Sequence, residues 1–183
     1  MKKALKYISI GVVIILLACL SIGLLHPSIE YTNSVEIDAT VEEVFDVFTD
    51  ENLASEWLIG YKGYEILEGA PNVPGSEFLM KFEHATIDEN NDTTVMAFEF
   101  TETLTVFKEN VEFSFDMITD MFTGSVKVEF AGSNPCTVTA TTSNTGNNIF
   151  YKSLFHLSES MFVEQSQLNY DLLKDLIEKR DEQ

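Results

Sequence analysis

The sequence feature that most constrains the fold is a series of segments between Tyr61 and Ser143 in which apolar and polar residues alternate. A period of two places every second side chain on the same face, as in β-strands with one buried side. Turn-forming residues separate these segments, for example GSNP at residues 132–135. Short strands joined by short turns predict an antiparallel sheet in which consecutive strands pair.

The stretch that precedes these strands, Val35–Leu58, combines a strand with two helices. Residues Thr32–Asp38 alternate and predict a half-buried strand. Thr40 and Glu43 have the spacing of a capping box, which marks the start of a helix. Apolar residues then recur at helical spacing, which predicts a helix with one apolar face. A second short helix is predicted to end at Trp57, the single tryptophan of the chain.

Parity along the strands separates an outward polar face from an inward face that is mostly apolar. A turn at Asp88–Asp92 predicts that Phe78 pairs with Glu102 and that His84 pairs with Met96. We expect the inward face to form one wall of a ligand cavity, because aromatic walls rich in methionine suit adaptable pockets. The residues predicted for this wall are Phe78, Met80, Phe82, His84, Met96, Phe98, Phe100, Glu102, Phe113, Phe115 and Met117.

A long amphipathic segment, Ile149–Lys179, follows the last predicted strand. Apolar residues recur along it at helical spacing, which predicts one long helix with an apolar stripe. Packed against the inward face of the sheet, this helix would close the cavity. Four residues of its first half are predicted to complete the cavity wall: Phe150, Leu154, Leu157 and Met161.

The N-terminal region combines a basic tail, residues 1–7, with 18 uncharged residues, 8–25. This length reaches the lower limit for crossing a bilayer, so residues 8–25 are predicted as a transmembrane helix that anchors the protein in a membrane. Three lysines lie in the tail, and no Lys or Arg follows until Lys62. The positive-inside rule then predicts a single-pass protein with a cytoplasmic N-terminus and an extracytoplasmic domain. Residues 26–31 are predicted as a linker and residues 32–180 as the domain.

Two other interpretations of the N-terminal region stay open. The run LLAC at residues 16–19 resembles a lipobox, in which case Cys19 would be the acylated residue of a bacterial lipoprotein. A secreted protein is the second alternative, with SIG at residues 21–23 as the small-residue cleavage site. Cys136 alternates with apolar residues and is predicted to be a small core residue, so no disulfide is expected.

The charge balance of the chain excludes several classes of partner. The formal net charge is −19, and without the three N-terminal lysines only 8 Lys and Arg stand against 30 Asp and Glu. A domain this acidic repels phosphate backbones, so no nucleic-acid partner is expected.

Three scattered histidines form no metal-binding group, and no phosphate-binding glycine loop is present. The sequence therefore predicts neither a metal nor another cofactor.

The order of these elements, together with several local motifs, resembles one known superfamily. The stretch VEIDATVEEVFDVFTDENLASEWL (35–58) resembles the opening of the START-like SRPBCC superfamily, in its polyketide cyclase/dehydrase-like branch. The resemblance extends to VPGSEF (73–78) and to QSQLNYDLLK (165–174) in the terminal helix, and it covers about 150 residues from Tyr31 onward. It implies an α+β helix-grip fold. In this fold a curved antiparallel sheet of about seven strands wraps around a long C-terminal helix, and two short helices follow the first strand.

The resemblance also implies a cavity between the sheet and the long helix that holds a hydrophobic or amphipathic small molecule or lipid. We expect a noncatalytic binding role and assign no catalytic residue, because the sequence shows no convincing catalytic set. One alternative is a cyclase/dehydrase-like enzyme that uses a single cavity carboxylate or histidine, Glu102 or His84. A buried carboxylate would have a raised pKa and could act as a base. A domain that binds a protein partner is another alternative, which predicts a filled cavity and an exposed apolar patch.

Overall fold

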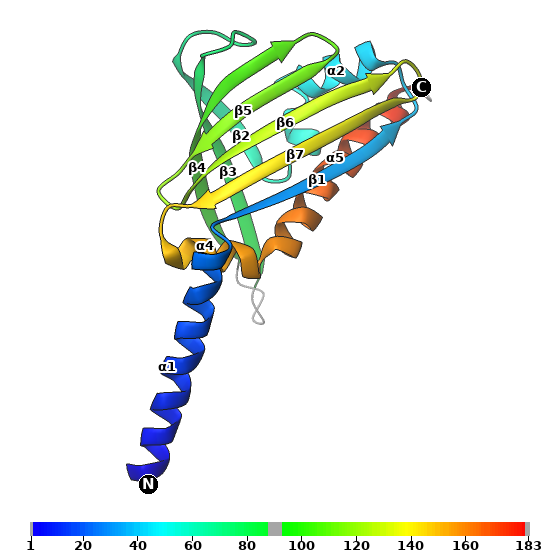
Figure 1. The fold of residues 1–183 in the computed structure, drawn as a ribbon. Helices are drawn as coiled ribbons and strands as arrows, with labels where there is room; N and C mark the ends of the chain where they lie inside the picture. The colour runs from blue at the N-terminus through cyan, green and yellow to red at the C-terminus, as the bar shows by residue number, and fades with distance from the viewer. Residues whose placement is uncertain (1, 88–92, 182–183) are drawn as a thin grey trace.

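The computed structural model describes residues 2–87 and 93–181 of the chain. In chain order the elements are α1 (Lys2–Leu25), β1 (Ser28–Ile37), α2 (Val41–Thr49), α3 (Ala54–Trp57), β2 (Tyr61–Glu68), β3 (Glu77–Ile87), β4 (Thr93–Lys108), β5 (Glu112–Ile118), β6 (Phe122–Gly132), β7 (Cys136–Gly146), α4 (Ile149–Leu157) and α5 (Glu159–Asp181). The strands form one antiparallel sheet in the order β1-β7-β6-β5-β4-β3-β2. This sheet curves around α5 (Figure 1). The predicted α+β helix-grip fold is confirmed.

The pairing of the strands follows the alternation in the sequence. Consecutive strands from β2 to β7 are neighbours, and β1 closes the order by pairing with β7. In the β3–β4 hairpin, Phe78 pairs with Glu102 and His84 pairs with Met96, as predicted. The turn predicted at Asp88–Asp92 lies outside the described residues.

The predicted capping box starts helix α2. The Glu43 backbone N–H donates to the Thr40 hydroxyl at 3.3 Å, and the Thr40 backbone N–H donates to the Glu43 carboxylate at 2.9 Å. Two N–H groups at the helix end are therefore paired reciprocally. The apolar face of α2 buries Val44 and Phe45 in the core.

The core lies between α2, α5 and the inner faces of β1, β6 and β7. Burial alternates strictly along β7, as expected for a strand with one face in the core. Cys136 is fully buried at the start of this strand, which confirms it as a small core residue. Across the core, Leu173 and Ile177 of α5 pack on these strands.

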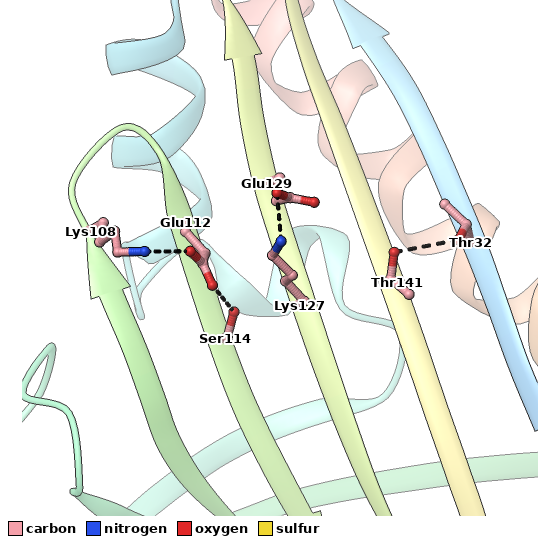
Figure 2. Close-up of polar contacts among 7 residues, drawn as sticks. All are labelled: Thr32, Lys108, Glu112, Ser114, Lys127, Glu129 and Thr141. Atoms are coloured by element: carbon pink, nitrogen blue, oxygen red, sulfur yellow. Dashed lines mark hydrogen bonds and ion pairs between the residues drawn. The ribbon is translucent and has the colours of Figure 1, made fainter. Parts of the chain in front are cut away.

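The outer face of the sheet is polar. Figure 2 shows that Lys108 pairs with Glu112 and that Lys127 pairs with Glu129 across this face, at 2.8 and 2.7 Å. Such exposed ion pairs contribute little to stability. The outer face is therefore the solvated side of the sheet, and the inner face carries the core and the cavity.

The predicted long C-terminal helix is two helices, which corrects the sequence-based expectation. The break lies at Ser158, whose backbone N–H donates to the carbonyls of both Leu154 and Phe155 and so tightens the last turn of α4. Helix α5 then runs in a different direction across the sheet (Figure 1). Its buried face consists of Tyr170, Leu173 and Ile177.

The N-terminal helix α1 leads almost directly into the sheet. Strand β1 begins at Ser28, so residues 28–31, which were predicted as part of a linker, belong to a strand. Over the described residues, no helix combines the length and the apolar character needed to cross a bilayer, so the transmembrane helix predicted at 8–25 is not supported. The Cys19 side chain lies outside the described part of the chain, and the lipoprotein and cleaved-signal alternatives stay predictions.

Candidate functional site

A pocket of about 410 Å³ opens between the inner face of the sheet, the two short helices and α5. Its size falls in the range of small-molecule sites. Aromatic and aliphatic side chains make up most of its wall. The lining residues are Phe48, Thr49, Asp50, Glu51, Ala54, Trp57, Leu58, Tyr61, Tyr64, Pro71, Asn72, Phe78, Met80, Glu102, Leu104, Phe113, Phe115, Ser166, Asn169 and Tyr170.

Irregularities in the strands shape this side of the sheet. The β2–β3 pairing shifts register between Tyr61 and Gly63, and the β4–β5 pairing shifts between Leu104 and Val106. Shifts of this kind bend a strand locally and increase its twist. The bent strands leave a space next to the inner face of β3 and β4, and the neighbouring helices do not fill this space.

Helix α3 and helix α5 hold the aromatic part of the wall. Trp57 lies between Phe48 and Tyr170, with ring centroids 5.2 Å and 6.5 Å away. The side-chain amide oxygen of Asn169 accepts a hydrogen bond from the Ile59 backbone N–H at 3.1 Å. This bond connects α5 to the chain just after α3. The aromatic wall is thereby fixed from two sides.

Glu102 is the buried carboxylate of the pocket. It lies on β4 opposite Phe78 of β3 and Met117 of β5, and only 8% of the residue is exposed. Burial in these apolar surroundings raises the pKa of Glu102 to about 7, because the charged form loses its hydration. Among the described residues, the lining contains no Lys, Arg or His that could balance a negative charge.

A tyrosine pair continues the polar part of the wall along β2. The Tyr64 hydroxyl donates to the Glu51 carboxylate, and this hydrogen bond raises the pKa of Tyr64 to about 12. Burial raises the pKa of Tyr61, with a smaller contribution from the negative charges of Glu51 and Glu102. Both phenols therefore stay neutral at physiological pH, as hydrogen-bonding groups.

Trp57 contributes a polar atom as well as a ring. Its indole N–H is buried and has no hydrogen-bond partner among the described residues. A buried donor without a partner costs about 1–3 kcal/mol. The nitrogen has almost no accessible surface, so this donor does not face the open space of the pocket.

The structure brings five of the sequence-predicted wall residues into this pocket and places the other ten elsewhere. Those in the pocket are Phe78, Met80, Glu102, Phe113 and Phe115. Four others are half-buried on the inner face but outside the pocket lining: Phe82, Phe98, Phe100 and Met117. Six are exposed or lie on the α4 side of the domain: His84, Met96, Phe150, Leu154, Leu157 and Met161.

Several lining residues were missed by the sequence analysis. Tyr61 and Tyr64 lie on β2, where the register shift disturbs the parity on which the prediction depended. Ser166, Asn169 and Tyr170 come from α5, where the sequence analysis considered only the apolar stripe of the predicted long helix. The spacing of Ser166, Asn169 and Tyr170 at i, i+3 and i+4 is the signal that could have identified this face of the helix.

A second hollow, of about 480 Å³, lies on the outer face of the sheet. Its lining is mostly charged and hydroxylated, and it includes the paired Lys127 and Glu129. Ligand pockets are usually lined by apolar and aromatic groups with a few polar ones. The inner pocket matches that description better, and it is the candidate site.

The chain is similar to known proteins in its fold and in a family sequence pattern, while no curated protein matches its sequence. A conserved protein from Geobacillus kaustophilus superposes with a TM-score of 0.64 at 12% identity, over 82% of this chain and 96% of that one. The di-domain ARO/CYC StfQ from the steffimycin biosynthetic pathway gives 0.62 at 10% identity, over 86% of this chain and 53% of that one.

Ara h 8.0201 gives a TM-score of 0.55 at 9% identity, over 83% of this chain and 99% of that one. Identities this low show a shared fold and nothing further about the site. The sequence model of one family, described as polyketide cyclase / dehydrase and lipid transport, matches residues 28–157. These residues span β1 to α4 and therefore the whole sheet. The chain thus belongs to the polyketide cyclase / dehydrase and lipid transport family.

Proposed function

We propose that this protein binds one hydrophobic or amphipathic small molecule in the inner pocket and does not transform it. The observation that carries this proposal is the combination of a mostly apolar, partly open space of about 410 Å³ with a buried carboxylate, Glu102, in its wall. The family to which the chain belongs includes lipid transport in its description, which supports the same function. An open pocket also argues against a domain that only binds a protein partner, for which a filled cavity was predicted.

The charges around the pocket favour a neutral ligand. Asp50, Glu51 and Glu102 contribute carboxylates to the lining, and no cationic side chain is present there. An anionic group such as a fatty-acid carboxylate would meet like charges in a medium of low dielectric constant. A hydroxyl or carbonyl oxygen carries no such penalty, and it could accept a hydrogen bond from the Tyr61 hydroxyl or from the protonated form of Glu102. The ligand that fits is therefore an apolar molecule with a neutral oxygen.

The residues that line the pocket are better suited to binding a ligand than to catalysing its conversion. Acid–base catalysis usually needs a donor and an acceptor within reach of the same substrate. The pocket offers one carboxylate with a perturbed pKa, Glu102, and three tyrosines whose pKa values are raised, Tyr61, Tyr64 and Tyr170. None of these tyrosines would release its proton near pH 7.

Trp57 gives a direct measure of pocket occupancy, because it is the single tryptophan of the chain and lines the pocket. We expect its fluorescence emission to change on titration of the full-length protein with a long-chain alcohol. The carboxylate of the same chain length should bind more weakly at pH 8. If neither the alcohol nor an apolar extract of the host cells changes the emission, the proposed function is wrong.

Filling the pocket should weaken this binding. Ser166 lines the pocket from α5, and Ser166→Phe would place an aromatic ring in the space that the ligand needs. Overpacking costs about 1–3 kcal/mol, so the dissociation constant for the alcohol should rise about 5- to 150-fold. Ser160→Phe is the matched control, because Ser160 is exposed on the same helix and lies outside the lining. Equal affinities for the two variants would place the ligand elsewhere.

A cyclase/dehydrase-like enzyme is the second candidate, and the buried Glu102 is the observation that favours it. A carboxylate with a pKa of about 7 is suited to act as a general base near neutral pH. Mass spectrometry of a ligand that co-purifies, before and after incubation with fresh protein, separates the two functions. Conversion that Glu102→Gln abolishes would favour the enzyme, and an unchanged ligand favours the binding protein.

A further inference from the structure

Helix α4 exposes an apolar stripe on the side that faces away from the sheet. Phe150, Leu154 and Leu157 on α4, with Met161 at the start of α5, are 59%, 42%, 57% and 60% exposed. Their spacing places them along one side of the helical segment. Phe155, on the other side of α4, is buried, and Ser153 is buried next to Gly23 of α1. The helix is therefore amphipathic, and the structure leaves its apolar side uncovered.

The stripe continues onto α1, and the two helices are closely joined. The Gly23 backbone N–H donates to the Ser153 hydroxyl at 3.1 Å. A Cβ at Gly23 would approach the Ser153 hydroxyl to 2.5 Å and the Ile149 carbonyl oxygen to 2.6 Å, so the helices cross at a distance that only glycine permits. The rings of His26 and His156 stack beside this crossing, with centroids 4.5 Å apart.

Helix α1 leaves the domain at this point with apolar side chains of its own exposed. Leu17, Leu24 and Leu25 are among them. In Figure 1, α1 projects from the end of the domain at which α4 lies. The stripe on α4 and the exposed apolar side chains of α1 form one surface, called here the α1–α4 surface. Exposed apolar residues that are scattered singly are normal, whereas clustered ones mark interaction sites.

The distribution of charge sets this surface apart from the rest of the chain. All 30 acidic residues lie at residues 30–129 and 159–183, so the segments 1–29 and 130–158 contain none. These two segments supply α1 and α4, and they meet at the α1–α4 surface. Lys152 of α4 and the lysines near the start of α1 are the charged residues of the two helices. The surface is thus apolar and weakly cationic in a protein with a net charge of −19.

We propose that the α1–α4 surface binds the surface of a phospholipid bilayer, with α4 lying along the headgroup layer and its apolar stripe in contact with the acyl chains. Helices that lie in this layer combine an apolar side with a cationic or polar side. Nine residues of helix extend about 14 Å, which is enough to lie on a bilayer and too short to cross one. This inference does not depend on the function of the pocket.

A second copy of the chain is a poorer occupant of the same surface. Association would bring together two chains that each carry a net charge of −19, and their repulsion opposes the contact. A bilayer of zwitterionic lipid carries no such charge. The absence of acidic residues from α1 and α4 has a physical reason in this case, since a carboxylate at the headgroup layer would lose hydration and meet lipid phosphates.

Tryptophan fluorescence in vesicles tests the position of α4. Full-length protein is reconstituted into phosphatidylcholine vesicles, either plain or with brominated acyl chains, which quench tryptophan at short range. Phe150→Trp and Leu157→Trp place a new tryptophan on the stripe, and the wild-type protein gives the background from Trp57. Val111→Trp is the matched control, because Val111 is 53% exposed in the β4–β5 turn, at the opposite end of β5 from α4.

We expect the bromines to quench the two stripe variants several-fold more than the wild type, and to leave Val111→Trp at the wild-type level. Circular dichroism of each variant verifies that the fold is retained. The proposal would be overturned if, in vesicle-bound protein, Phe150→Trp and Leu157→Trp were quenched no more than the wild type. That result would mean that water or another protein chain, and not lipid, contacts the stripe.

Discussion

Phe45→Ala is expected to lower the free energy of unfolding by about 3–5 kcal/mol, the range measured for large-to-small changes at buried aromatic positions. Phe45 is 2% exposed on α2, and its ring meets the edges of Phe107 and Phe130 at 5.5 and 5.0 Å. Its removal would leave a cavity between α2 and the sheet and delete both aromatic contacts. A loss of this size is a large part of the stability of a single domain.

Urea denaturation of the full-length protein, followed by far-ultraviolet circular dichroism, measures this effect. Phe150→Ala is the matched control, because it removes the same side chain at a position that is 59% exposed. Its free energy of unfolding should change by less than about 0.5 kcal/mol. Similar losses in the two variants would mean that Phe45 does not lie in the core as the structure describes.

Glu102→Gln is expected to stabilise the protein above pH 7 and to have little effect near pH 4.5. The unfolded chain releases the Glu102 proton near pH 4.5, whereas the folded protein releases it only near a pKa of about 7. Between these values the folded state holds more protons, so its stability falls as the pH rises and stays low above pH 7. The difference corresponds to about 3 kcal/mol. Glutamine is neutral throughout and avoids this loss.

Denaturation curves at pH 4.5 and pH 8 check this prediction. The gain is the difference in the free energy of unfolding between the variant and the wild type at each pH. Glu99→Gln is the control, because Glu99 lies on the same strand with its side chain exposed. The control should follow the wild-type protein at both pH values. A gain for Glu102→Gln that is equal at the two pH values would show that burial does not perturb the pKa of this carboxyl.

Most of the fold could be predicted from the sequence because its local signals agree with each other. The alternation in the strands fixed which residues pair, and the pairing of Phe78 with Glu102 and of His84 with Met96 followed from a single assumed turn. The capping box at Thr40 and Glu43 fixed the start of α2. These signals depend on neighbours in sequence or on one hairpin, so they need no knowledge of the tertiary packing.

How deeply each side chain is buried could not be predicted in the same way. Parity assigns a side chain to a face of the sheet, but it does not say whether another layer covers that face. Strands β3 and β4 are longer than β5, so one end of their hairpin extends beyond the packed region. His84 and Met96 lie on this end and are exposed, although their parity is that of Phe78 and Glu102.

The α5 side of the pocket was missed for a different reason. Apolar periodicity over Ile149–Lys179 is continuous in the sequence, so it predicted one helix with one buried stripe. The break at Ser158 changes the direction of the chain, which turns Phe150 and Leu157 outward and Tyr170 inward. A single serine in a helical pattern is a weak signal for a break. The packing of α4 against α1 and of α5 against the sheet decides where it occurs.

The short connection between α1 and β1 limits how far the domain can move. Only His26 and Pro27 separate the two elements, and proline restricts the backbone further. A flexible linker of two residues would span about 8 Å, and longer linkers extend the reach only with the square root of their length. The pocket therefore stays at a nearly constant height above whatever surface α1 occupies. A ligand of the proposed kind would have to diffuse to the pocket, because the domain cannot extend away from α1 to collect it.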